Sequence, residues 1–135
     1  SDAFAVEHLH AAARGRRVAV KSLLMDNHVV VGVGNIYATE ALFMAGIHPA
    51  RRCDRIAFPR YRALTGAVKT VLAQAIAAGG TTLRDFQRED GRPGYFRIQL
   101  QAYGRAGEPC PRCGGVLKTR QIGQRASAYC PHCQR

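Results

Sequence analysis

Two short cysteine pairs close this chain, at Cys110-Pro-Arg-Cys113 and Cys130-Pro-His-Cys133, and 16 residues separate them. Two such pairs at this separation are typical of tetrahedral thiolate coordination of one zinc ion. Four sulfur ligands fill the coordination shell and leave no position for water or substrate. The sequence therefore predicts one structural Zn²⁺, bound by Cys110, Cys113, Cys130 and Cys133.

The residues between the cysteine pairs have the pattern of a β-hairpin. Residues 116–122 and 126–129 are predicted strands on either side of the turn Gly123-Gln124, and Arg125 follows the turn directly. A rigid hairpin with an arginine at its tip is suited to binding a phosphate group. The alternative is a hairpin that only completes the zinc module and has no binding partner.

The composition fits a folded domain with a zinc module. Hydrophobic residues make up 47% of the chain, which is enough for a packed core. We find no run of about 18 apolar residues and no signal peptide, so we expect no membrane segment. The cysteine spacing favours metal binding in a reducing cytoplasm over a disulfide framework, and it leaves Cys53 as a free thiol.

The chain is strongly basic, with a formal net charge of +11. The excess lies in the second half, and residues 110–135 carry five Lys and Arg residues and no Asp or Glu. A positive excess beside a zinc hairpin and glycine-rich turns favours a polyanion as the partner. The alternative is a basic surface that only keeps the protein hydrated.

Hydrophobic periodicity predicts a helical first half. We expect helices from Ser1 or Asp2 to about Arg14, with Phe4 among its buried residues, and over 18–25, 36–45 and from Pro59 to the glycines at 79 and 80. An extended segment over 95–103 is expected to lead into the zinc module. These features predict a helical domain over 1–88, a connection over 89–104 and a zinc finger over 105–135.

The turn Gly32-Val33-Gly34-Asn35 precedes the third predicted helix. Glycines allow a ligand to approach the backbone closely, and the N–H groups at a helix N-terminus favour an anion. The alternative is that Asn35 only caps its own helix as the N-cap residue.

On the same helix, Glu40 is interpreted as a carboxylate that lies on the helix surface or that satisfies polar groups of the core. It is not interpreted as a general base. His48 is expected to make a local hydrogen bond.

Several longer runs resemble bacterial formamidopyrimidine-DNA glycosylases, and the resemblance extends over essentially the whole chain. They are residues 24–27, 32–40, 45–49, 79–83, 90–96, 103–110, 124–127 and 129–130. The resemblance implies a mainly α helix-two-turn-helix domain followed by a small β-hairpin zinc finger with four cysteine ligands. The endonuclease VIII group shares this layout but usually lacks the long runs at 34–37 and 46–49, so it is the second choice.

The resemblance implies a role in base-excision repair. Such enzymes remove oxidised purines, such as 8-oxoguanine and formamidopyrimidines, from damaged double-stranded DNA and then nick the abasic strand. It implies DNA contacts by Asn35, Arg125, Gly34 and Lys21, and a loop near the extruded base with Thr81, Thr82 and Tyr95. A monomer in the bacterial cytoplasm, associated with the nucleoid, would be expected.

The family's N-terminal proline nucleophile and its adjacent glutamate have no counterpart in this sequence. The chain begins with residues that resemble the family just after its N-terminal domain. We therefore expect the DNA-binding C-terminal portion of a glycosylase and AP lyase, with no catalytic residue of its own and no activity alone. The alternative from another class is a non-enzymatic zinc-ribbon module that binds nucleic acid or protein.

Overall fold

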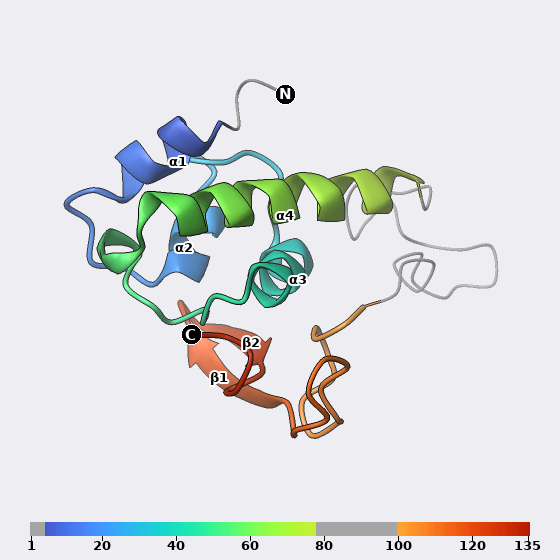
Figure 1. The fold of residues 1–135 in the computed structure, drawn as a ribbon. Helices are drawn as coiled ribbons and strands as arrows, with labels where there is room; N and C mark the ends of the chain where they lie inside the picture. The colour runs from blue at the N-terminus through green and yellow to red at the C-terminus, as the bar shows by residue number, and fades with distance from the viewer. Residues whose placement is uncertain (1–4, 78–99) are drawn as a thin grey trace.

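A computed structural model describes residues 5–77 and 100–135 of the chain (Figure 1). The helices are α1 (Val6–Ala13), α2 (Val20–Met25), α3 (Asn35–Ala45) and α4 (Phe58–Ala77), with a short 3-10 helix, η1 (Cys53–Arg55), before α4. Strands β1 (Lys118–Ile122) and β2 (Arg125–Tyr129) follow. The predicted fold class, a mainly helical part followed by a small β-hairpin with a four-cysteine cluster, is confirmed.

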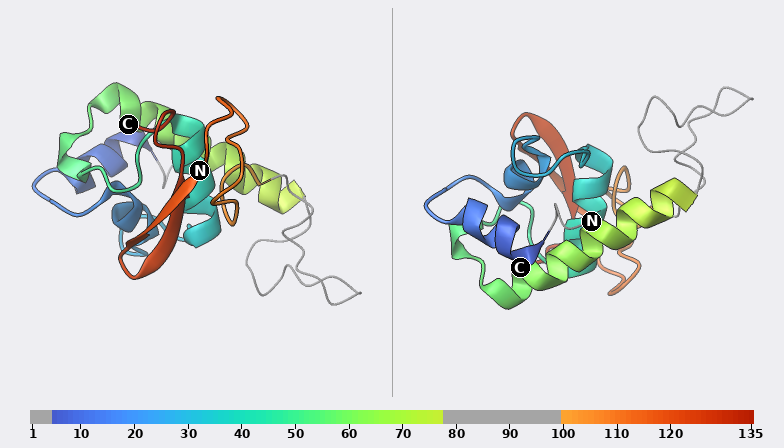
Figure 2. Two further views of the ribbon diagram at one scale, coloured as in Figure 1. Left: turned by 90° about the horizontal axis from the view of Figure 1, so that it is seen from below. Right: turned by 90° about the horizontal axis from the view of Figure 1, so that it is seen from above.

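Helix α3 lies at the centre of the molecule. Its residues are apolar or small on almost every side, and all of them from Asn35 to Phe43 are buried. A helix that is apolar all round requires cover on all sides. Helix α4 packs across one side of α3, and the hairpin packs on the other (Figures 1 and 2). This arrangement puts the N-terminus of α3 next to the hairpin.

The helix ends agree with the prediction in most places. Gly46 has a φ of 72° and caps α3, with its N–H directed to the carbonyl groups of Leu42 and Phe43. Helix α4 begins one residue before Pro59. The predicted α1 start at Ser1 or Asp2, and the buried Phe4, lie outside the described residues. So does the predicted end of α4 at the two glycines.

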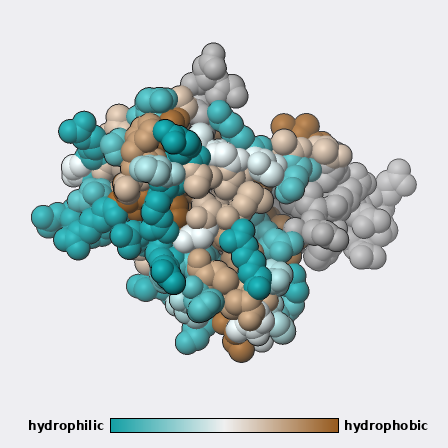
Figure 3. Space-filling view, viewed as in Figure 1, coloured by the Kyte–Doolittle hydropathy of each residue, from teal (hydrophilic) through white to brown (hydrophobic). Residues whose placement is uncertain are grey.

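Helix α2 begins at Val20, two residues later than predicted. The carbonyl of Val18 accepts a hydrogen bond from the Cys53 N–H at 2.9 Å, and Ala19 forms an antiparallel bridge with Arg52. Ala19 is therefore extended, and these long-range backbone contacts keep residues 18 and 19 out of the helix. The same pairing places the loop before α2 beside η1, where hydrophilic side chains gather on the surface (Figure 3).

The hairpin turn is confirmed. Gly123 and Gln124 both have positive φ values, 56° and 65°, as a two-residue type I′ turn requires. Strand β1 begins at 118 and not at 116, because Val116 pairs with Pro109 in an isolated bridge. Strand β2 begins at Arg125, one residue earlier than predicted.

The extended segment predicted over 95–103 is only partly described. Residues 95–99 lie outside the described residues, and residues 101–104 form a bend and a turn instead of a strand. No helix in the described ranges is long and apolar enough to cross a membrane.

Candidate nucleic-acid interface and zinc centre

The four predicted ligand cysteines lie together. Their sulfur atoms are all within 4.8 Å of one another, and the pairs Cys110–Cys133 and Cys113–Cys130 are 3.9 and 3.6 Å apart. Four thiolates around Zn²⁺ with Zn–S bonds of about 2.3 Å would have sulfur separations of about 3.8 Å. The donor set and its spacing therefore fit one tetrahedral zinc ion, which holds the two ends of the module together.

Backbone N–H groups support this centre. The N–H groups of Arg112, Gly115 and Cys133 each lie 3.4 Å from a cysteine sulfur, namely Sγ of Cys110, Cys113 and Cys130. Such donors stabilise the negative charge of thiolates. All four coordination positions are taken by sulfur, so the ion is structural and has no open position for a reaction.

The zinc module is fastened to the helical domain by side chains that sequence reasoning missed. Arg112 donates to the Met44 carbonyl at 3.0 Å, and its guanidinium lies 5.1 Å from the ring centre of Phe43. Gln134, only 2% exposed, accepts from the Cys130 N–H and donates to the Ile47 carbonyl. The Gln134 contact joins residues 87 positions apart, so no local pattern indicates it.

Asn35 is the first residue of α3 and lies at this junction. The alternative that Asn35 only caps its own helix as the N-cap residue is wrong, because Gly34 occupies the cap and no side-chain cap hydrogen bond forms. The Asn35 side chain instead turns to the hairpin, where Nδ2 donates to the Ala126 carbonyl at 3.2 Å. The Asn35 side chain therefore bonds to the hairpin and not to its own helix. The residue is only 9% exposed.

Lys21 lies behind Asn35 and is only 1% exposed. Its Nζ donates to Asn35 Oδ1, to Ser127 Oγ at 2.6 Å and to the Ala126 carbonyl at 3.4 Å. Burial, followed by repulsion from Arg125, lowers the pKa of Lys21 to about 8. The direct DNA contact predicted for Lys21 stays a prediction.

Arg125 is exposed at the start of β2, directly after the turn. Its carbonyl accepts a hydrogen bond from Ser127 Oγ at 3.1 Å. The structure therefore brings Gly34, Asn35, Lys21 and Arg125 to one place, where the start of α3 meets the tip of the hairpin. Thr81, Thr82 and Tyr95, predicted for the lesion loop, lie outside the described residues.

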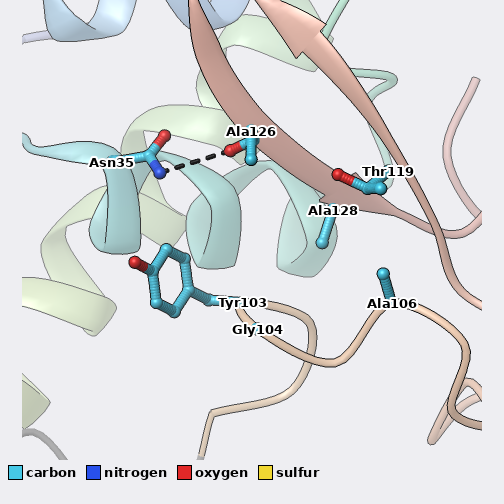
Figure 4. A pocket seen from close by; sticks show the side chains of 7 residues that line it. All are labelled: Asn35, Tyr103, Gly104, Ala106, Thr119, Ala126 and Ala128. Carbon is cyan, nitrogen blue, oxygen red and sulfur yellow. Dashed lines mark hydrogen bonds between the residues drawn. The ribbon is translucent and has the colours of Figure 1, made fainter.

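A pocket of about 310 Å³ opens beside this cluster (Figure 4). It lies between the N-terminus of α3, one face of the hairpin and the segment 103–106. Thr119, Ala126 and Ala128 line it from the same face of the hairpin, as the two-residue period of strands requires. Asn35 forms part of its wall, so a ligand group that enters the pocket can reach the Asn35 side chain.

Glu40 holds the start of the zinc module against α3. It is 6% exposed and accepts hydrogen bonds from three consecutive backbone N–H groups, those of Gln101, Ala102 and Tyr103, at 2.6, 2.8 and 2.8 Å. The interpretation of Glu40 as a core-satisfying carboxylate is confirmed.

Comparison with known families agrees with this arrangement. Residues 1–87 match the model described as "Formamidopyrimidine-DNA glycosylase H2TH domain". Residues 107–135 match the model described as "Zinc finger found in FPG and IleRS". The first model matches more than half of the chain, and the second includes all four cysteines.

Individual relatives show the same similarity. The chain is 63% identical over 135 residues to a formamidopyrimidine-DNA glycosylase of Alcanivorax borkumensis and 62% identical over 133 residues to one of Alkalilimnicola ehrlichii. These alignments cover 100% and 98% of this chain but 50% and 48% of the relatives. The chain therefore spans about half the length of the curated relatives that it matches.

Solved structures also match. The crystal structure of the MutM (FPG) protein from Thermus thermophilus has a TM-score of 0.87 at 39% identity, over 99% of this chain and 51% of that one. A complex between Lactococcus lactis Fpg and DNA with an abasic site has a TM-score of 0.85 at 30% identity, over 98% and 48%. The family models, the relatives and the solved structures all indicate the same family. The chain therefore belongs to the formamidopyrimidine-DNA glycosylase H2TH family and carries the zinc finger found in that family.

Proposed function

We propose that this chain is the DNA-binding part of a base-excision-repair DNA glycosylase and AP lyase that acts on oxidised purines. The relatives support this, since they are formamidopyrimidine-DNA glycosylases, and related MutM and Fpg proteins have been solved in complex with abasic-site DNA and with DNA containing carbocyclic 8-oxo-G. The observation that carries the proposal is that the Asn35 side chain bonds to the hairpin at Ala126, directly beside the exposed Arg125, where helix α3 adjoins the zinc hairpin. The chemical step is assigned to residues outside these 135.

The proposed contacts are with phosphates around the lesion. Arg125 is exposed and offers a guanidinium that can bind two phosphate oxygens at once. One N–H of the Asn35 amide bonds to Ala126, and the second is available to a phosphate, as is the backbone at Gly34. Extruding a damaged base costs a few kcal/mol, and contacts that hold the distorted backbone offset this cost.

We further propose that the chain works as two units, a helix-two-turn-helix domain over 1–88 and a zinc finger over 105–135, joined by 89–104. The two family matches, at 1–87 and 107–135, support this division. We place the protein in the bacterial cytoplasm as a monomer associated with the nucleoid, where its substrate lies. Thr81, Thr82 and Tyr95 are proposed to lie near the extruded base.

The proposal is tested by measuring binding of the zinc-loaded chain to three ligands. These are a duplex with an abasic-site analogue, the same duplex undamaged, and a structured RNA. We expect the tightest binding to the abasic duplex and an affinity that falls steeply between about 50 and 200 mM salt. Tighter binding to the RNA would instead favour the non-enzymatic zinc-ribbon alternative, and an affinity that barely changes with salt would contradict binding through phosphate contacts.

The variant Arg125→Ala tests the proposed phosphate contact. It should weaken binding to every duplex about equally and reduce the slope of log affinity against log salt by about 1. The matched control is Arg14→Ala, which removes an exposed arginine from the loop after α1 and should change affinity much less. Equal effects of the two variants on affinity would mean that only the overall charge matters.

A full-length relative that prefers oxidised pyrimidines to 8-oxoguanine would favour the endonuclease VIII alternative.

A further inference from the structure

Lys21 is a buried amine whose position suggests a role other than a phosphate contact. It lies on α2, is 1% exposed, and directs its Nζ at Asn35 and at the hairpin. We propose that Lys21 is a positioning residue that holds the Asn35 carboxamide and the hairpin tip together, so that Asn35 and Arg125 meet the DNA as one rigid pair. This inference rests on the proposed DNA-binding function.

The first part of this role is to fix the orientation of the Asn35 amide. An ammonium group only donates hydrogen bonds, so the atom of Asn35 that faces Lys21 must be the carbonyl oxygen, Oδ1. The Ala126 carbonyl only accepts, so the atom that faces it must be the amide nitrogen, Nδ2. Both contacts require the same orientation, in which the donor side of the amide faces the hairpin and the pocket.

The second part is to order the hairpin tip. Ser127 Oγ accepts from Lys21 at 2.6 Å and donates its own proton to the Arg125 carbonyl at 3.1 Å. The Ser127 hydroxyl is fully buried, so it depends on these partners. A chain of hydrogen bonds thus runs from Lys21 through Ser127 to the backbone of Arg125, and a second bond runs directly from Lys21 to Asn35.

The charge around Lys21 links this role to DNA. Helix α3 presents the neutral Asn35 amide to the ammonium group, and the hairpin presents the Ser127 hydroxyl and, as its charged group, Arg125. Burial and Arg125 hold the pKa of Lys21 at about 8, so the free protein loses this proton at mildly alkaline pH. A phosphate bound at Asn35 and Arg125 would favour the charged form, so DNA binding above about pH 8 should take up a proton.

The first test is a double-mutant cycle on affinity for the abasic duplex. Lys21→Met and Asn35→Ala should each weaken binding about tenfold, as expected for loss of a hydrogen bond to a charged group. The loss in the double variant should be clearly smaller than the sum of the two single losses in free energy, because part of the effect of Lys21 passes through Asn35 and the rest through the hairpin tip. The control Lys69→Met, on the exposed side of α4, should leave affinity nearly unchanged. Additive losses would overturn the proposal and indicate an independent phosphate contact by Lys21.

The second test needs no DNA. The side-chain amide resonances of Asn35, followed by NMR in the zinc-loaded chain, should shift with a midpoint near pH 8. This titration should vanish in Lys21→Met, although the variant keeps its zinc and its helical circular dichroism. Amide resonances that do not change across this pH range would overturn the positioning role. Failure of the unaltered chain to bind damaged DNA would instead overturn the proposed function, and the NMR result would still decide the role of Lys21.

Discussion

Gln134 donates a 3.0 Å hydrogen bond from Nε2 to the carbonyl of Ile47 and thereby ties the last turn of the zinc module to the loop after α3. Its Oε1 accepts from the N–H of Cys130, a zinc ligand, at 2.8 Å. The adjacent backbone strengthens this junction, because Arg135 and the loop after α3 exchange two hydrogen bonds of 3.0 Å. One buried amide side chain therefore satisfies polar groups on both sides of the interface.

Gln134→Ala should therefore destabilise the zinc-loaded chain. The buried N–H of Cys130 and the carbonyl of Ile47 would both lose their partner, which costs about 1–3 kcal/mol. Denaturation by urea, followed by circular dichroism, measures this loss. The control Gln74→Ala removes an exposed glutamine from α4 and should change the unfolding free energy by less than about 0.5 kcal/mol. Equal stabilities of the two variants would contradict the structural role of Gln134.

Glu40→Gln should destabilise the chain although the two side chains have the same shape. The glutamine would direct an NH₂ group at the backbone N–H groups of residues 101–103, where the carboxylate now accepts three hydrogen bonds. At least one buried donor would be left without an acceptor, at a cost of about 2 kcal/mol. The melting temperature should fall relative to that of Glu7→Gln, which alters an exposed glutamate of α1. An unchanged melting temperature would contradict this account.

Removal of zinc should unfold the hairpin but leave much of the helical part intact. Except for Phe43, the buried apolar residues of α1 to α4 form one cluster, and Phe43 packs in a second cluster with Ala102, Leu117 and two zinc cysteines. A chelator should therefore abolish DNA binding while most of the helical circular dichroism remains. Cys113→Ala should also lose the zinc ion, whereas Cys53→Ala, which alters the buried cysteine outside the cluster, should retain one zinc per chain.

Stability should fall as the pH drops below about 6.5, partly through His48. Its Nδ1 accepts a hydrogen bond from the Ala50 N–H at 3.0 Å, which requires that nitrogen to be unprotonated. Burial, and then the charge of Arg120, lowers the pKa of His48 below its usual 6.5. As the pH falls, His48 therefore takes up its proton in the unfolded chain before it does so in the folded chain. The stabilisation that unprotonated His48 provides is complete above pH 6.5 and is lost as the pH falls toward the lowered pKa.

His48→Asn isolates this contribution, because an asparagine can still accept from the Ala50 N–H but does not titrate in this range. Unfolding free energies measured at about pH 7.5 and about pH 5.5 should differ more for the unaltered chain than for the variant. The reverse order would mean that protonation of His48 stabilises the folded state.

Incubation with an abasic duplex and borohydride should give no covalent adduct with this chain. A Schiff base requires an accessible neutral amine. Lys21 has a pKa of about 8 but is buried, and its ammonium protons point at Asn35, Ala126 and Ser127. Electrophoresis of the reduced mixture measures trapping, and an adduct formed at the rate of a complete glycosylase would contradict the assignment of chemistry to other residues.

Local patterns were sufficient for several features of the site. The spacing of the four cysteines predicts the zinc centre, because the two ligands of each short pair can reach one ion with little help from the remaining fold. The glycine after the third helix and the two-residue hairpin turn were also predicted, since both require backbone conformations that few residues adopt. Strand and helix starts were less accurate where a distant backbone segment determines the hydrogen bonding, as at Val18 and Val116.

The sequence by itself thus determined the zinc ligands, the helical first half and the hairpin, because each depends on residues close together along the chain. Only the tertiary structure decided what Asn35, Lys21, Glu40 and Gln134 do. Their partners lie 91, 106, 62 and 87 residues away in the sequence. A buried polar side chain must satisfy its hydrogen bonds with whatever the fold places beside it, and that neighbour is fixed only when α3, the hairpin and the zinc module pack together.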